Sequence, residues 1–186
     1  MSRFAEDAQR VAAEIGAALQ RVDDAQVDAL VDELLAAGSV LVAGVGREGL
    51  AARGLAMRLV HAGVRAHWVW GDTTPAVGPG DLALVISGSG QIGHLDHVAR
   101  RAQEAGARLA VVTAQPAGVT AARADVVLRL PAAAYGATED VVPSVQPMGS
   151  LFEQVALVTF DLLVLQLVDR SGQRLDALAS RHRNVE

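Results

Sequence analysis

Cysteine is absent from the 186 residues of this sequence, which excludes a disulfide framework and a catalytic thiol. The net charge is −5 and the arginines are scattered, so the chain lacks the basic face that nucleic-acid binding needs. No uncharged apolar run reaches the length of a membrane span, and the N-terminus lacks the apolar segment of a signal peptide. We therefore expect a cytoplasmic protein that binds neither nucleic acid nor a membrane.

The chain is rich in aliphatic and small residues, with 51% hydrophobic and only 3% aromatic positions. From residue 39 onward, short and almost continuously apolar strands alternate with helices. This pattern is typical of a parallel sheet covered by helices on both faces. The expected strands cover 39–44, 64–70, 81–86, 108–113 and 125–130, and the expected helices between them cover about 48–62, 93–105 and 117–123. We predict one α/β domain over residues 1–186, with its sheet core at about 39–130.

Helical segments flank this core on both sides. Two helices are expected over about 4–37, the second capped by the Asp23-Asp24 pair, and C-terminal helices over about 150–181. The proline-containing segment 131–149 is predicted to be a long loop, and loops of that length are often functional. The N-terminal helices and the very apolar stretch 155–168 exceed what one small sheet needs as cover. We expect the excess apolar surface of these helices to be buried between subunits, and hence a homo-oligomer.

The first expected strand runs into a glycine-rich turn, Gly44-Val45-Gly46-Arg47-Glu48-Gly49. It fits the G-x-G-x-x-G pattern of dinucleotide-binding folds. However, the next acidic residue, Asp72, follows Gly44 by 28 residues rather than by about 20, and Thr73-Thr74-Pro75 interrupts the expected continuation. The turn therefore has three interpretations: an anion cradle, a nucleotide site, or a tight turn without a ligand.

A second turn, Ser87-Gly88-Ser89-Gly90, follows the third expected strand. Its glycines allow backbone N–H groups to converge, and its hydroxyls add donors for a phosphate. A structural Ser-Gly turn with a helix cap is the alternative. Because parallel sheets bind ligands outside the carboxyl ends of their strands, the two turns together favour a small polyol phosphate as ligand.

The order of these motifs resembles the sugar isomerase (SIS) domain family, most of all its 6-phospho-3-hexuloisomerase branch. The resemblance covers nearly the whole chain and is carried by four further stretches. These are Ala56–Gly63, Gly71–Ala76, Gln146–Gln154 and Arg181–Glu186. It implies a three-layer sandwich with a five-stranded parallel sheet, a homotetramer with active sites between subunits, and no cofactor. It also implies interconversion of 3-hexulose 6-phosphate and fructose 6-phosphate, as in the ribulose monophosphate pathway.

Both turns depart from this family's pattern. The first turn usually reads Gly-Arg-Ser-Gly, with a serine that helps to hold the phosphate, whereas this chain has Glu48. The second turn usually continues with Glu or Thr and then a phosphate-facing Thr, whereas this chain has Gln91 and Ile92. A carboxylate about 4 Å from a phosphate dianion costs roughly 1–4 kcal/mol. Either the phosphate is held by Ser87, Ser89 and the turn amides with help from His94 or Arg47, or the substrate carries no phosphate there.

Moving a carbonyl between neighbouring carbons needs a base and donors for the enediolate oxygens, but no metal. Glu153 matches the carboxylate that the family proposes as catalytic; the alternative is a helix-terminal carboxylate or a capping-box partner of Ser150. His61 matches a histidine of the family motif, and His182 in the tail is a candidate to reach a neighbouring site. Both have the alternative of a simple helix-end or solvated histidine. A metal held by His94 and His97 is disfavoured because no third ligand is suitably spaced.

We therefore predict a sugar-phosphate isomerase in which Glu153 is the base and His61 assists at the oxygens. The substrate-binding residues are expected to be Gly46, Arg47, Glu48, Ser87, Gly88, Ser89, Gly90, Gln91 and His182. One alternative is an isomerase whose sugar carries another anion, such as a sulfonate, or none. A second is a non-catalytic sugar-phosphate sensor with the same pocket.

Overall fold

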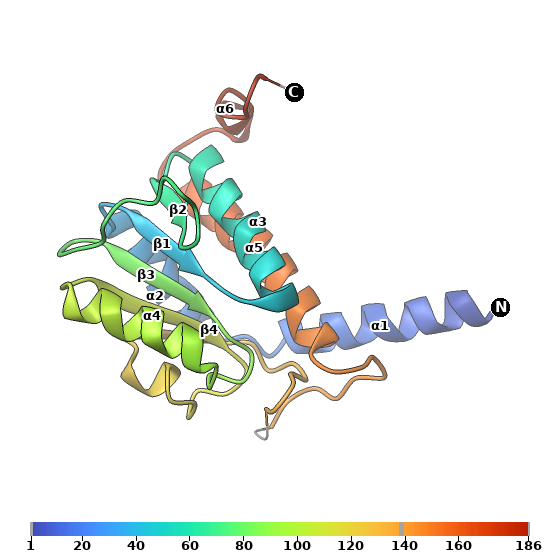
Figure 1. The fold of residues 1–186 in the computed structure, drawn as a ribbon. Helices are drawn as coiled ribbons and strands as arrows, with labels where there is room; N and C mark the ends of the chain where they lie inside the picture. Colours follow the sequence, from blue (N-terminus) through green and yellow to red (C-terminus); the bar gives the residue numbers. More distant parts are fainter. Residues whose placement is uncertain (1, 138–139, 186) are drawn as a thin grey trace.

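The computed structural model describes residues 2–137 and 140–185, and its centre is a single five-stranded parallel sheet (Figure 1). The strands lie side by side in the order β2-β1-β3-β4-β5. Their bounds are Val40–Ala43 (β1), Ala66–Trp68 (β2), Leu82–Ile86 (β3), Arg108–Thr113 (β4) and Val126–Arg129 (β5). Val42 of β1 pairs with Leu84 of β3, and all four neighbouring strand pairs are parallel. The α/β class and the parallel sheet expected from the apolar strands are confirmed.

Helices cover both faces of this sheet. One face carries α2 (Asp24–Ala36), α3 (Gly46–His61) and α5 (Ser150–Arg170); the other carries α4 (Gly93–Glu104) and a short 3₁₀ turn, η1 (Ala121–Arg123). Successive strand residues point to opposite faces. Leu84 accordingly joins the core beneath α3 and α5, whereas Val85 joins the core beneath α4. The result is the three-layer sandwich that was predicted.

Helix α5 lies at the centre of the larger core. Phe152 and Phe160 are among its fully buried side chains. Among the described helices, α5 is the one whose length and composition would allow it to cross a membrane, but ten of its residues are buried inside the protein. Its burial marks α5 as a core helix of this fold.

Two helices lie at the ends of the chain. The N-terminal α1 (Arg3–Leu19) projects from the body as an arm, and only Ala18 of it is buried (Figure 1). The C-terminal α6 (Leu175–Ala179) lies at the opposite end of the molecule. The expected helices in the first 37 residues are both present, and the Asp23 side chain caps α2 by accepting a hydrogen bond from the Ala25 N–H at 2.8 Å.

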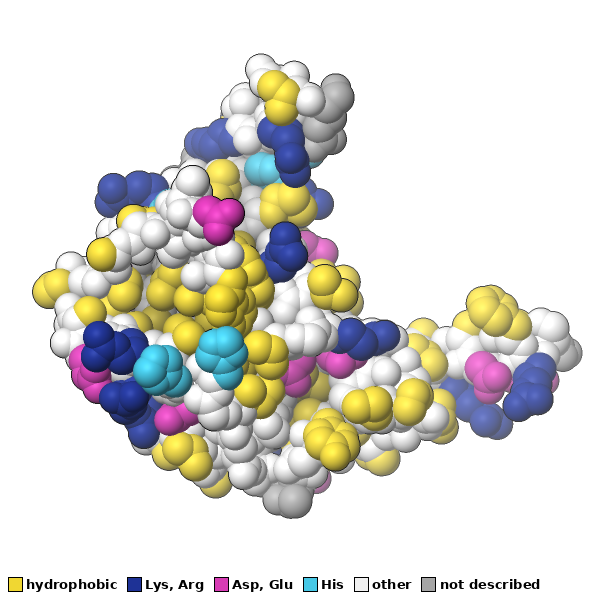
Figure 2. Space-filling view, viewed as in Figure 1, with side chains coloured by type: hydrophobic (Ala, Val, Ile, Leu, Met, Phe, Trp, Pro, Cys, Tyr) yellow, Lys and Arg dark blue, Asp and Glu magenta, His cyan; other side chains and the backbone are white. Residues whose placement is uncertain are grey.

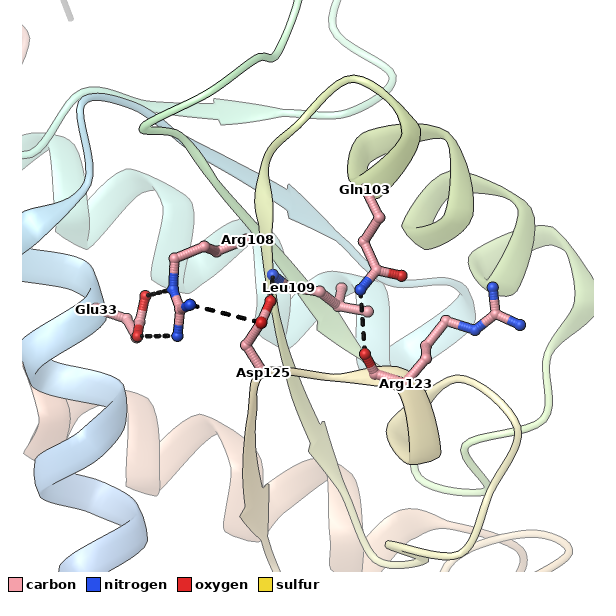
Figure 3. Close-up of polar contacts among 6 residues, drawn as sticks. All are labelled: Glu33, Gln103, Arg108, Leu109, Arg123 and Asp125. Atoms are coloured by element: carbon pink, nitrogen blue, oxygen red, sulfur yellow. Dashed lines mark hydrogen bonds and ion pairs between the residues drawn. The ribbon is translucent and has the colours of Figure 1, made fainter.

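A charged cluster ties α2 to the sheet (Figure 3). Arg108, at the start of β4, donates hydrogen bonds to the two carboxylate oxygens of Glu33 at 2.6 and 2.7 Å. Asp125 lies 3.5 Å from the same guanidinium and accepts the Leu109 backbone N–H at 2.8 Å. The cluster lies at the amino end of β4, away from the glycine-rich turns, so it stabilises the fold without contributing to the site.

Three boundaries differ from the sequence-based expectation. Helix α3 begins at Gly46, because Gly46 has a φ of 56° and turns the chain directly into the helix. Strand β2 has only three residues. The helix expected at 117–123 shrinks to η1, because the preceding residues pack on the second turn, where Thr120 donates its N–H to the Gly90 carbonyl at 3.0 Å.

Candidate active site

The two glycine-rich turns meet at the carboxyl ends of the adjacent strands β1 and β3, the edge where open parallel sheets bind ligands. They are joined directly, because Glu48 of the first turn accepts the Gly88 N–H of the second at 3.1 Å. The first turn of α5 reaches the same edge, where Glu153 forms an ion pair with Arg47. The structure thus brings Arg47, Glu48, Gly88 and Glu153 together.

The first turn depends on glycine for close packing. A Cβ atom on Gly49 would lie 2.9 Å from the Gly44 carbonyl oxygen, so only glycine allows α3 to approach the end of β1 this closely. The residue before α3, Val45, provides no side-chain cap. The helix therefore begins with amide groups that no side chain caps, as an anion site at a helix N-terminus requires.

The second turn is held together by its own serines. Ser87 Oγ accepts the Gly90 N–H at 3.1 Å, and Ser89 Oγ accepts the Gln91 N–H at 3.3 Å. Ser87 is fully buried, whereas Ser89 is partly exposed. The two serines that looked equivalent in the sequence therefore differ: Ser89 is the one whose hydroxyl a ligand can reach, and Ser87 shapes the turn.

Glu153 is oriented toward α3. Its carboxylate pairs with the Arg47 guanidinium, and its side chain is 16% exposed against 64% for Arg47. Helix α5 starts at Ser150 with Gly149 as its N-cap, and the structure shows no side-chain cap there. The capping-box alternative is therefore wrong: Ser150 is already the first helical residue, so it cannot cap the helix, and the Glu153 carboxylate is paired with a cation of the neighbouring helix.

Glu48 occupies an unusual environment for a carboxyl group. Burial raises its pKa from 4.5 to about 7, the hydrogen bond from Gly88 opposes this rise, and the charge of Glu153 adds to it. Its second oxygen, Oε2, is buried and has no hydrogen-bond partner among residues 2–137 and 140–185. At neutral pH the group is therefore present in both its neutral and its charged form.

A pocket of about 350 Å³ opens beside the Arg47–Glu153 pair, in the size range of small-molecule sites. It lies between α3 and α5, which run parallel from this point: Gly54 lies near Leu157, and Arg58 lies 4.0 Å from Asp161. Its lining residues are Arg47, Leu50, Ala51, Glu153, Gln154 and Leu157. One charged end and an apolar wall suit a small polar ligand.

A second pocket of about 300 Å³ lies on the other side of the first turn. Trp68, Trp70, Arg53 and His94 contribute to its wall. The His94 ring packs against Trp70 with ring centroids 5.3 Å apart, and Arg53 lies over Trp68. His94 is thus near the first turn and in contact with an aromatic side chain.

His61 and His182 form a separate pair, with ring centroids 5.2 Å apart. His61 is the last residue of α3, fourteen residues after Arg47, which corresponds to about 21 Å along a helix axis. Burial lowers its pKa, and the nearby charges of His182 and Arg58 lower it further. Within one chain, neither histidine is brought next to Glu153.

Two supporting contacts were missed by sequence reasoning. Thr113, buried at the end of β4, donates its hydroxyl to the Gly88 carbonyl at 3.2 Å and so holds the second turn. The signal available in the sequence for this contact was a polar residue, Thr113, at the end of an apolar strand. Gln146 and Gln154 exchange hydrogen bonds at 2.9 and 2.8 Å, which ties the long loop to α5. The spacing of Gln146 and Gln154 in the sequence does not predict this contact.

The long loop itself was predicted correctly. Within the described parts of 131–149 the chain makes only an isolated bridge, between Ala132 and Val142. Met148, next to the start of α5, has a φ of 56°, an uncommon conformation for a residue other than glycine. Across residues 2–137 and 140–185, no group of three His, Asp or Glu side chains is placed to hold a metal ion.

Comparison with known proteins gives a consistent result. Residues 33–160 match the model of the SIS domain family. A 3-hexulose-6-phosphate isomerase from Mycobacterium gastri is 40% identical over 173 residues, which cover 93% of this chain and 86% of the relative. One from Bacillus subtilis (strain 168) is 34% identical over 165 residues, 89% of each chain.

A solved structure agrees with these relatives. A hypothetical protein from Methanococcus jannaschii, for which a function of 3-hexulose-6-phosphate isomerase has been inferred, superposes with a TM-score of 0.84. It is 28% identical and covers 97% of this chain and 99% of its own. The named relatives are enzymes, which favours the isomerase interpretation over the sensor.

Proposed function

The chain belongs to the SIS domain family and is an isomerase of sugar phosphates, and on that premise we propose that it interconverts 3-hexulose 6-phosphate and fructose 6-phosphate. The observation that carries the proposal is the position of Glu153, whose carboxylate meets Arg47 beside both glycine-rich turns. All of residues 1–186 act as one domain in the cytoplasm, and the enzyme serves the ribulose monophosphate route.

In the reaction, Glu153 removes the hydrogen on C2 of the 3-ketose as a proton. The electrons left behind form the C2–C3 double bond of an enediolate, and Glu153 returns the proton to C3. Arg47, which is mostly exposed and already beside Glu153, stabilises negative charge on the oxygens. No cofactor takes part in these steps.

The phosphate is bound at the turns. Ser89, which is partly exposed, supplies a hydroxyl, and the backbone around Gly46 and Gly90 supplies the shape, since both glycines have positive φ angles of 56° and 63°. Gln91 continues the second turn, and its backbone already bonds Ser89. These groups together form an anion pocket without a metal.

The enzyme works as a homo-oligomer, a dimer or tetramer, with sites completed between subunits. Large apolar side chains are exposed on the outer sides of α3 and α5. They are Leu50, Met57, Val60, Leu157, Leu162 and Leu165. Such a face is typical of subunit interfaces. In this arrangement His61 and His182 of a second copy reach the site that they cannot reach within their own chain.

A direct assay tests the proposal. The purified protein is expected to isomerise fructose 6-phosphate, and Glu153→Gln is expected to lower kcat at least about 100-fold, the usual contribution of a general base. Glu104→Gln, on the exposed end of α4, is the matched control and keeps full activity. Turnover only of a sulfonated or unphosphorylated hexose would reject the phosphate, and full activity of Glu153→Gln would reject the base.

A further inference from the structure

The isomerisation described above moves two hydrogens, and Glu153 accounts for only one of them. The hydrogen on carbon passes from C2 to C3, but a proton must also reach the old carbonyl oxygen and another must leave the new one. His61, expected to assist at the oxygens, lies at the far end of α3 from Glu153 in the same chain. Proton transfer at the two oxygens therefore needs a second titratable group. This group either lies next to Glu153 in the same chain or comes from another subunit.

Glu48 follows Arg47, the ion-pair partner of Glu153, in the first turn of α3. Its Oε1 is fixed by the Gly88 N–H at 3.1 Å, while Oε2 is buried without a hydrogen-bond partner in the described part of the chain. A carboxylic acid held in this way carries its proton on Oε2, and none of the described protein atoms accepts that proton. Buried polar groups are almost always paired, so an unpaired one calls for a role.

The described surroundings of Glu48 are apolar and contain one charge of the same sign, that of Glu153. A Cβ on Gly88 would lie 2.8 Å from Glu48 Oε1, 2.9 Å from Ala134 Cβ and 3.1 Å from Phe152 Cδ1, so these atoms converge on one point. Glu153 of α5 is the charged group that acts on Glu48, and Arg47 is paired with Glu153. The second turn presents only serine and glycine side chains here.

We propose that Glu48 is the second proton-transfer residue of this isomerase, acting at the substrate oxygens while Glu153 acts at the carbons. This inference rests on the proposed function. As Glu153 takes the C2 hydrogen, Glu48 gives its Oε2 proton to the C3 carbonyl oxygen, which leaves a neutral enediol. The Glu48 carboxylate then takes the proton of the C2 hydroxyl as Glu153 protonates C3. Both carboxyl groups return to their starting states, and no further reactant is needed.

Two properties of the site support this role. A pKa of about 7 leaves Glu48 able both to give and to take a proton near neutral pH, which is the condition for efficient acid–base catalysis. The two carboxyl groups also lie in unlike environments: Glu48 in an apolar one, and Glu153 paired with a cation. In such pairs the apolar carboxyl group usually serves as the acid and the ion-paired one as the base. Since Oε2 is shielded from water, proton transfer requires the Glu48 side chain, or the atoms that cover it, to move when the sugar binds.

The test compares Glu48→Gln with the wild type and with Glu104→Gln. Glu48→Gln keeps an acceptor for the Gly88 N–H but cannot exchange a proton. We expect kcat to fall about 100-fold with KM changed by less than about threefold. Wild-type kcat should fall as pH rises through about 7, and Glu48→Gln should lose this limb. Glu104→Gln should match the wild type in both respects.

Three results would overturn the inference: a wild-type kcat in Glu48→Gln, an unchanged alkaline limb, or absence of the protonated-carboxyl band of Glu48 in infrared difference spectra at pH 6. The spectra of the wild type need no measurement of activity. They therefore still show whether Glu48 is protonated if the Glu48→Gln variant folds poorly. Glu48→Ser serves as a second variant and is expected to lose the same limb. An inactive wild type or a fully active Glu153→Gln would instead reject the proposed function itself.

Discussion

Burial of the Glu48 carboxyl couples folding stability to pH in the direction opposite to that of an ion-paired carboxylate. Its pKa rises from 4.5 to about 7 in the folded chain, so the folded state holds the proton more tightly than the unfolded state does. The stabilisation from this group is therefore complete below about pH 4.5 and is lost as pH rises toward 7. By the usual conversion it amounts to at most about 3 kcal/mol.

We expect Glu48→Gln to remove this dependence, because an amide does not titrate. Between pH 5 and pH 8, the free energy of unfolding of the wild type should fall by about 2–3 kcal/mol more than that of Glu48→Gln. Urea unfolding at several pH values measures the difference, and Glu104→Gln controls for loss of a carboxylate at the surface. Parallel pH dependence of the wild type and Glu48→Gln would contradict the buried environment of Glu48.

At the scale of elements, the C-terminal tail docks on the end of α3. Arg181 donates a hydrogen bond to the His61 carbonyl at 2.9 Å, and His182 packs against the His61 ring. A histidine whose pKa is lowered on folding supports stability above its ordinary value of about 6.5 and costs stability as pH falls through that value. Acidification therefore loosens this contact.

We expect His182→Ala to raise the pKa of His61, since it removes one of the positive charges that lower it. NMR titration of the imidazole resonances measures the change. His97→Ala, an exposed position on α4, should leave the His61 titration unaltered. An unchanged pKa of His61 in His182→Ala would show that the tail does not dock as described.

The elements were predictable to different degrees for physical reasons. Continuous apolar runs such as 82–86 are typical of strands in a sheet covered on both faces, and their alternation with helices predicted the layers. Helix ends were less predictable. Helix α3 begins at Gly46 because this residue has a positive φ, a conformation that glycine allows but does not require. The contact of Glu48 with Gly88 joins residues forty positions apart, and no local pattern encodes it. The catalytic assignments of Glu153 and His61 stay predictions.

At the scale of the whole molecule, the exposed apolar side chains of α3 and α5 are the feature on which the proposed oligomer depends. Figure 2 shows hydrophobic side chains gathered across the middle of the drawn face, whereas the arm formed by α1 carries mostly charged and other side chains. Met57 and Leu165 are about half exposed, at 46% and 49%, on parallel helices. Fully burying an aliphatic side chain contributes about 1.5–3 kcal/mol, so burying the exposed half of each of these side chains between two copies would stabilise an oligomer.

We expect the wild type to be an oligomer in light scattering, and Leu165→Glu to reduce its mass, because a buried carboxylate at the interface is strongly unfavourable. Val119→Glu is the matched control: Val119 is 57% exposed, next to η1 and away from α3 and α5. If sites are completed between subunits, activity should fall with the mass in Leu165→Glu and stay intact in Val119→Glu. A monomeric wild type with full activity would exclude shared sites and would leave His61 and His182 without a part in the reaction.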